Sequence, residues 1–62
     1  MIIEGVRYYR FRVTFRMTTG QRRSWIRWSP GQPWVFEEVG RELLERFGIS
    51  GVKAGSCKVV ML

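Results

Sequence analysis

The chain has 62 residues, with eleven Lys and Arg against five Asp and Glu, so its net charge is +6 at pH 7 and its sequence pI is near 10.8. Hydrophobic residues make up 45% and aromatic residues 15%, which is enough for a compact core and excludes a disordered chain. The length excludes a multidomain protein, and we expect residues 1–62 to form a single small basic domain. A domain this basic is typical of proteins that bind nucleic acid.

Rare residue types restrict the chemistry further. The chain has one cysteine, Cys57, and no histidine, so neither an intrachain disulfide nor a metal site is expected. We expect Cys57 to pack as a small hydrophobe. Arginines supply no general base at neutral pH, so we expect a binding protein without cofactors and not an enzyme. No apolar run is long enough to span a membrane, and Glu4 and Arg7 interrupt any signal-peptide pattern, so a cytoplasmic protein is expected.

Residues Val6–Thr18 alternate between apolar and polar side chains, which indicates a strand with one buried face. The apolar set is Tyr9, Phe11, Val13, Phe15 and Met17, and the polar set is Tyr8, Arg10, Arg12, Thr14, Arg16 and Thr18. A second strand, from about Arg22 to Ser29, also alternates. Its two sets are Ser24, Ile26 and Trp28, and Arg23, Trp25 and Arg27.

Residues Thr18 to Gln21 form the turn between these strands, because Gly20 tolerates the positive φ of a tight hairpin. A two-residue turn at Gly20 and Gln21 would place Phe15 opposite Ile26. A turn at Thr19 and Gly20, or a four-residue loop, would instead place Val13 opposite Ile26. Both registers put Ile26 and Trp28 on the apolar face, so we expect Trp28 in the core and Trp25 on the basic face.

Residues 32–48 have the pattern of a helix that follows a break at Ser29–Pro33. Pro33 suits the first turn, with Gln32 or Ser29 as the cap, an acidic first turn favours the helix dipole, and Gly48 ends the helix. We expect Gly40 to allow close packing on the sheet and Trp34 to join the core. The predicted apolar face consists of Phe36, Val39, Leu43, Leu44 and Phe47.

A last strand is predicted at Cys57–Leu62, after a glycine-rich loop. The fold is therefore predicted to be α+β with element order β-β-α-β. A three-stranded antiparallel sheet of order 2-1-3 would carry one helix on one face, and the other face would be open to solvent.

The open face is the predicted functional site, because it combines arginines and aromatic residues and contains no carboxylate. Arginine binds phosphates and guanine edges, and aromatic rings stack on bases. The ribbon could enter a duplex major groove, or a single strand could lie across the sheet. The predicted nucleic-acid-binding residues are Tyr8, Arg10, Arg12, Arg16, Arg22, Arg23, Trp25 and Arg27.

The stretch YRFRVTFRMTTGQRRSWIRW and the helix after it loosely resemble the arm-type DNA-binding domains of phage integrases, over roughly residues 8–47. In that family the sheet face contacts a DNA groove, and the resemblance implies the same contact here. The alternative hypothesis is a small interaction or inhibitor module, of the phage or plasmid type, that binds an acidic protein surface. A homodimer through Trp34, Val60 and Leu62 is a further hypothesis, because the sheet edge is open.

Overall fold

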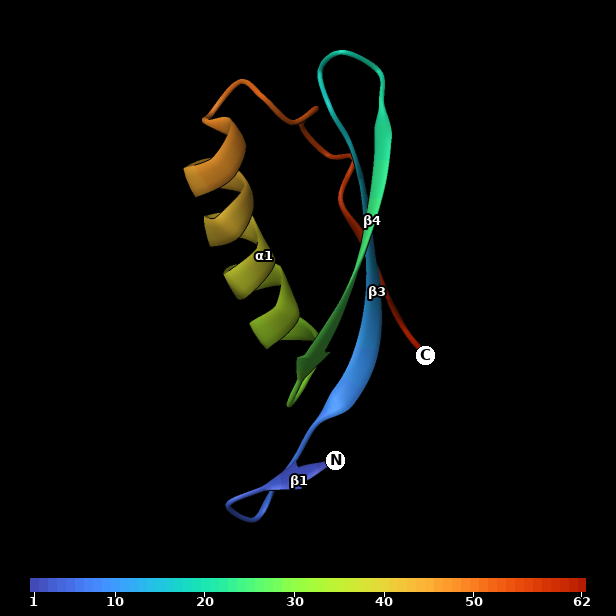
Figure 1. Cartoon of the computed structure of the whole chain (residues 1–62), viewed down its shortest axis with the longest axis vertical. Coiled ribbons are helices and arrows are strands. Elements are labelled where there is room, and N and C mark those ends of the chain that lie inside the picture. Colours follow the sequence, from blue (N-terminus) through green and yellow to red (C-terminus); the bar gives the residue numbers. More distant parts are fainter.

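The computed structural model describes residues 1–62 and contains five strands and one helix. They are β1 (Ile2–Ile3), β2 (Val6–Arg7), β3 (Tyr9–Arg16), β4 (Arg22–Ser29), α1 (Gln32–Phe47) and β5 (Lys58–Met61). The antiparallel sheet has the order β4-β3-β5, and β1 and β2 form a separate two-stranded sheet. Figure 1 shows α1 along one side of the three-stranded sheet. The predicted α+β fold with one helix is confirmed, but the chain order differs from β-β-α-β.

The difference arises from an N-terminal hairpin that alternation in the sequence did not reveal. Glu4 and Gly5 have φ values of 50° and 79°, so they form a two-residue turn of the kind that joins short antiparallel strands. Tyr8 interrupts the long predicted strand and separates β2 from β3. The hairpin lies beyond the end of the sheet in Figure 1, and its apolar side chains Ile2, Ile3 and Val6 are exposed.

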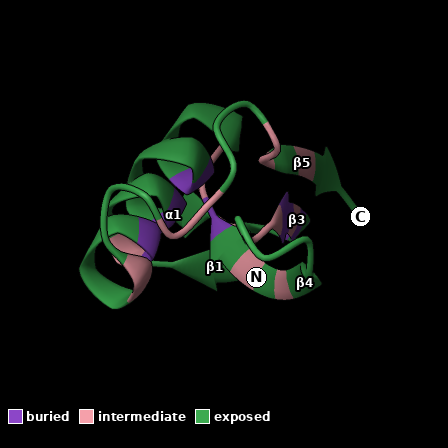
Figure 2. Cartoon of the chain, turned by 90° about the horizontal axis from the view of Figure 1, so that it is seen from above, coloured by how far each residue is buried: buried purple, intermediate pink, exposed green.

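The core lies between α1 and one face of the sheet, as the purple residues in Figure 2 show. Its six buried hydrophobic side chains come from every second position of β3 and from every fourth position of α1. These two spacings are the natural repeats of a strand and of a helix, so one face of each element is buried. The six residues are Phe11, Val13, Phe15, Val35, Val39 and Leu43.

The predicted helix face was partly wrong. The buried stripe includes Val35, whereas Phe36 and Leu44 are exposed on its flank. Trp34 is 58% exposed and does not join the core. Strand β5 has only four residues, so this edge of the sheet covers little of the 16-residue helix.

The two ends of α1 confirm some predictions and correct others. Pro33 lies in the first turn, and Gly48, with φ of 75°, follows the last turn and donates its N–H to the Leu44 carbonyl. The N-cap is Gly31, not Gln32 or Ser29, and it makes no side-chain cap. The first turn contains no acidic residue.

No helix in the structure has the length and apolar character needed to cross a membrane.

The register of β3 and β4 corrects the predicted position of every β4 side chain. Phe11, Val13 and Phe15 lie opposite Arg27, Trp25 and Arg23. The Met17 N–H donates to the Gln21 carbonyl, so the loop between the strands consists of the three residues 18–20. Within it the Gly20 N–H donates to the Met17 carbonyl, and Gly20 has a φ of 95°. A three-residue loop that ends in a left-handed glycine is a standard hairpin connection. Because its length is odd, the faces of β4 are exchanged relative to both predicted registers.

Two glycines in and after α1 predict opposite changes in stability. A Cβ on Gly51 would clash with the backbone carbonyl of Phe47, whereas a Cβ on Gly40 would meet nothing within 4 Å. Gly40 is exposed, so it does not provide the close packing predicted for it. Gly51→Ala is expected to lower the free energy of unfolding by about 1–3 kcal/mol, and Gly40→Ala to raise it by about 0.5–1 kcal/mol. Urea unfolding measures both, and a stabilised Gly51→Ala variant would contradict the loop position.

Candidate functional site

The open face is the side of the three-stranded sheet that points away from α1. Strand register fixes its composition, because residues directly opposite each other point to the same side. The polar residues of β3 therefore share this side with one set from β4 and one from β5. The set comprises Arg10, Arg12, Thr14 and Arg16, then Arg22, Ser24, Ile26 and Trp28, then Lys58 and Val60.

Arg16 and Arg22 are directly opposite each other at the hairpin end of this face. Two like charges in this position destabilise a sheet by repulsion. No carboxylate lies within ion-pair distance of either guanidinium, since the three ion pairs of the structure involve only Arg27, Arg41 and Arg46. The pair is therefore a cationic centre that lacks a counter-charge within the protein.

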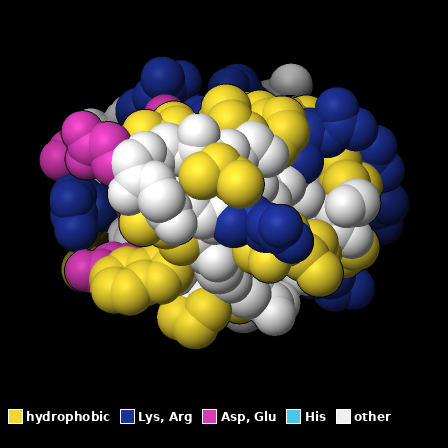
Figure 3. Space-filling view, turned by 90° about the horizontal axis from the view of Figure 1, so that it is seen from below, with side chains coloured by type: hydrophobic (Ala, Val, Ile, Leu, Met, Phe, Trp, Pro, Cys, Tyr) yellow, Lys and Arg dark blue, Asp and Glu magenta, His cyan; other side chains and the backbone are white.

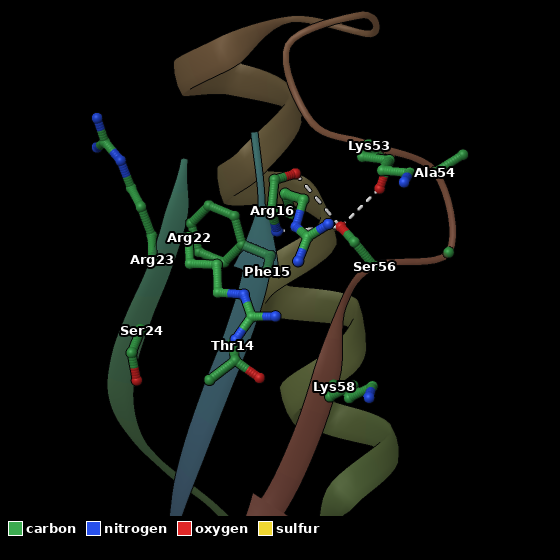
Figure 4. Close-up of a pocket in the computed structure, with 11 residues that line it drawn as sticks. Thr14, Phe15, Arg16, Arg22, Arg23, Ser24, Lys53, Ala54, Ser56 and Lys58 are labelled. Carbon is green, nitrogen blue, oxygen red and sulfur yellow. Dashed lines mark hydrogen bonds between the residues drawn. The ribbon is translucent and has the colours of Figure 1, made fainter. Parts of the chain in front are cut away.

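A cavity of about 610 Å³ lies beside this pair, between the hairpin and the loop that leads to β5. We call it the tip cavity. Figure 4 shows Arg16 and Arg22 extending into the space between hairpin and loop, whereas Arg23 points away. Five of its eleven lining residues are basic and none is acidic. The eleven lining residues are Thr14, Phe15, Arg16, Arg22, Arg23, Ser24, Lys53, Ala54, Gly55, Ser56 and Lys58.

Ser56 fastens the loop to the hairpin at this cavity. The Ser56 Oγ accepts a hydrogen bond from the backbone N–H of Arg16 at 3.1 Å. It donates one to the Lys53 carbonyl at 2.6 Å. The Lys53 backbone N–H donates to the Arg16 carbonyl at 2.8 Å, and the Ser56 Oγ lies 3.3 Å from the same carbonyl, so the loop is bonded to both backbone polar groups of Arg16. These bonds hold the cavity wall in place with neutral groups and leave the Arg16 guanidinium free.

The charges of the molecule are segregated between its two sides. Residues Gln32–Phe47 contain four Glu and two Arg, a balance of −2, and the rest contains nine basic residues and Glu4, a balance of +8. In Figure 3 acidic side chains gather on the left, the helix side, and the right side shows Lys and Arg without acidic neighbours. Such a distribution orients an approaching polyanion towards the sheet.

Four of the eight predicted site residues, Arg10, Arg12, Arg16 and Arg22, share the open face. Arg23, Trp25 and Arg27 point to the helix side instead, so their predicted place on the basic face is wrong. Tyr8 lies between β2 and β3, outside the three-stranded sheet, where its N–H donates to the Met1 carbonyl at 2.6 Å.

The three displaced β4 residues have partners in the core and on α1. Trp25 packs edge-on against Phe15 with ring centroids 4.8 Å apart. The Arg27 guanidinium lies 4.7 Å from the centroid of the Trp25 ring. The Arg27 Nη2 also contacts Glu42 at 3.1 Å, and the Arg23 guanidinium lies over Phe47. These contacts explain why this register is stable although it places arginines on the covered side.

The open face and the tip cavity also contain residues that the sequence had not indicated, one through the exchanged faces of β4 and two from β5 and its preceding loop. Trp28, predicted to lie in the core, is 46% exposed next to Arg10. Lys58 lies opposite Thr14, and Lys53 comes to the tip cavity on the loop. An odd loop ending in Gly20 was the one local signal that could have placed Trp28 correctly.

Cys57 is half-buried and packs against the core, which agrees with its predicted role as a small hydrophobe. Burial raises the pKa of its thiol, so the neutral form is favoured. No three His, Cys, Asp or Glu side chains are grouped closely enough to hold a metal ion.

Comparison with protein-family models, curated proteins and solved structures finds no match to this chain. A function therefore has to be inferred from the open face and the tip cavity. Their common property is positive charge without an internal counter-charge.

Proposed function

We propose that this protein binds nucleic acid through the open face. The observation that carries the proposal is the directly opposed, unpaired arginine pair Arg16 and Arg22 beside a cavity lined by five basic and no acidic residues. Phosphate groups are the counter-charges that such a surface lacks. Arginine forms paired hydrogen bonds to phosphate oxygens, which makes it well suited to this contact.

The energetics of the isolated protein support the proposal. A sheet selected for stability alone gains from carboxylates between its arginines, because opposite charges across strands stabilise and like charges destabilise. Four of the five acidic residues lie instead on α1, where two of them pair with the two helix arginines and with Arg27 on the covered side of β4, and none pairs with an arginine of the open face. The charge arrangement is therefore unfavourable for the free sheet and favourable for a bound polyanion.

The salt dependence of binding tests this proposal. Five basic side chains lie on the open face of the three strands, namely Arg10, Arg12, Arg16, Arg22 and Lys58. If each contacts one phosphate, the slope of log affinity against log salt is about −3.5 for a single strand and about −4.5 for a duplex. For a single strand, affinity would fall about 100-fold between 50 and 200 mM salt.

Fluorescence anisotropy of a labelled oligonucleotide at increasing salt gives this slope. A slope near zero, or no binding at about 50 mM salt, would contradict nucleic-acid binding by this face. Recovery of a protein partner that persists after nuclease treatment, without any oligonucleotide binding, would favour the acidic-protein hypothesis instead.

A further inference from the structure

The open face consists of two halves with different chemistry. Its residues form successive rows across β4, β3 and β5, as the register shows. The row of Arg22 and Arg16, with the loop beside it, and the row of Ser24, Thr14 and Lys58 are polar and border the tip cavity. We call this the tip half. It contains no exposed aromatic ring, so its side chains suit phosphate contacts and not stacking on a base.

The next two rows form the other half, which we call the platform half. Ile26 and Val60 lie on the two sides of Arg12, and Trp28 lies beside Arg10. The Leu62 N–H donates to the Arg10 carbonyl at 2.8 Å, so the chain continues along this edge. Ile26, Trp28 and Val60 are 44%, 46% and 58% exposed, so apolar surface borders the two arginines.

An exposed tryptophan beside arginines is suited to the flat face of an unstacked base. Rings of this kind stack on bases, and neighbouring guanidinium groups hold the phosphates between them. A duplex keeps its bases stacked inside and presents charged phosphates outside, so it offers little to the apolar part of the platform half.

The width of the sheet also disfavours entry into a duplex. The major groove is about 12 Å wide and admits a two-stranded ribbon. The sheet is three-stranded over the platform half, because residues Val59–Met61 of β5 pair there with Phe11–Val13 of β3. The outer backbones of three strands are about 10 Å apart before their own atoms are counted, so this part of the sheet fills or exceeds the groove.

From these observations we infer that the ligand of the open face is single-stranded nucleic acid, with phosphates at the tip half and a base stacked on Trp28 in the platform half. This inference rests on the proposed function. From Arg22 to Trp28 is six residues along β4, a distance of about 20 Å. About eight nucleotides cover it, even at the rise of roughly 3.4 Å per nucleotide of a stacked strand.

The experiment compares two single-residue variants on two probes of about eight nucleotides. One probe is oligothymidylate, and the other is an abasic strand with the same number of phosphates. Trp28→Ala is expected to lower affinity for oligothymidylate about tenfold and to leave affinity for the abasic strand within about twofold. Arg22→Ala is expected to lower affinity for both probes by a similar factor, about fivefold at 0.1 M salt.

Two controls keep the outcomes distinct. Trp28→Phe retains a stacking ring and is expected to recover most of the affinity for oligothymidylate, while circular dichroism confirms that each variant is folded. Annealing the same strand to its complement is expected to weaken binding. Equal losses on both probes for Trp28→Ala, or tighter binding of the duplex, would overturn the single-strand inference and leave the proposed function standing. Failure of the unmodified protein to bind either probe at low salt would overturn the proposed function itself.

Discussion

Replacing Arg12 and Arg22 together with alanine is expected to weaken oligonucleotide binding about 25-fold at 0.1 M salt. Each arginine that loses a phosphate contact removes about 0.7 from the slope of log affinity against log salt for a single strand. At 0.1 M salt this corresponds to about fivefold in affinity per arginine, and the two losses multiply. Both side chains are exposed on the open face, where neither has a carboxylate partner, so the substitutions leave no buried charge unpaired.

The control for this prediction has the same net charge. The double variant has a net charge of +4, which is +6 minus two, and Arg41→Glu also gives +4 because it exchanges one positive for one negative charge. Arg41 lies on α1, exposed, and pairs with Glu37 at 3.5 Å. Binding of Arg41→Glu is expected to stay within about twofold of the unmodified protein, apart from long-range effects screened beyond about 10 Å. Equal losses for both variants would show that net charge, not the open face, governs binding.

The largest loss of stability is expected for Phe15→Ala. Phe15 is 2% exposed and contacts both Trp25 and Phe47 through its ring. Removal of a buried phenyl ring costs about 3–5 kcal/mol. A domain of this length has a total stability of about 3–9 kcal/mol, so much of the variant is expected to be unfolded at 25 °C.

Ile26→Ala is the matched control and tests the register at the same time. Ile26 lies on the open face opposite Arg12, so its loss is expected to cost less than about 1 kcal/mol. In both predicted registers Ile26 belongs to the core, and the same substitution would cost about 2–5 kcal/mol. Chemical denaturation followed by circular dichroism separates these outcomes. A cost for Ile26→Ala similar to that for Phe15→Ala would contradict the observed register.

The parts of the fold that were predictable depend on strong local patterns. In β3 the large apolar residues occupy every second position and the arginines lie at positions between them, so its two faces follow from alternation alone. The helix was predictable for the same reason, since Pro33 and Gly48 mark its ends and its polar residues fall on one side. The four site residues that the structure brings together lie on β3 or at the start of β4.

The faces of β4 could not be derived from its own sequence, because RRSWIRWS places one tryptophan and at least one arginine on each face, Arg22 and Trp28 on one and Arg23, Trp25 and Arg27 on the other. Hydrophobicity therefore does not decide which tryptophan is buried. The choice depends on the odd loop at Gly20 and on distant partners, namely Phe15 for Trp25 and Glu42 for Arg27. The N-terminal hairpin escaped prediction because two-residue strands are too short to show a period.

If phosphates bind beside the opposed pair of Arg16 and Arg22, as we propose, binding also stabilises the fold, because a bound phosphate relieves the repulsion between the two guanidinium groups. Added salt is then expected to have opposite effects on the stability of the protein and on its affinity for nucleic acid. Screening is expected to weaken the repulsion and make the free protein more resistant to unfolding, whereas competition for the proposed phosphate contacts is expected to make the nucleic acid dissociate more readily.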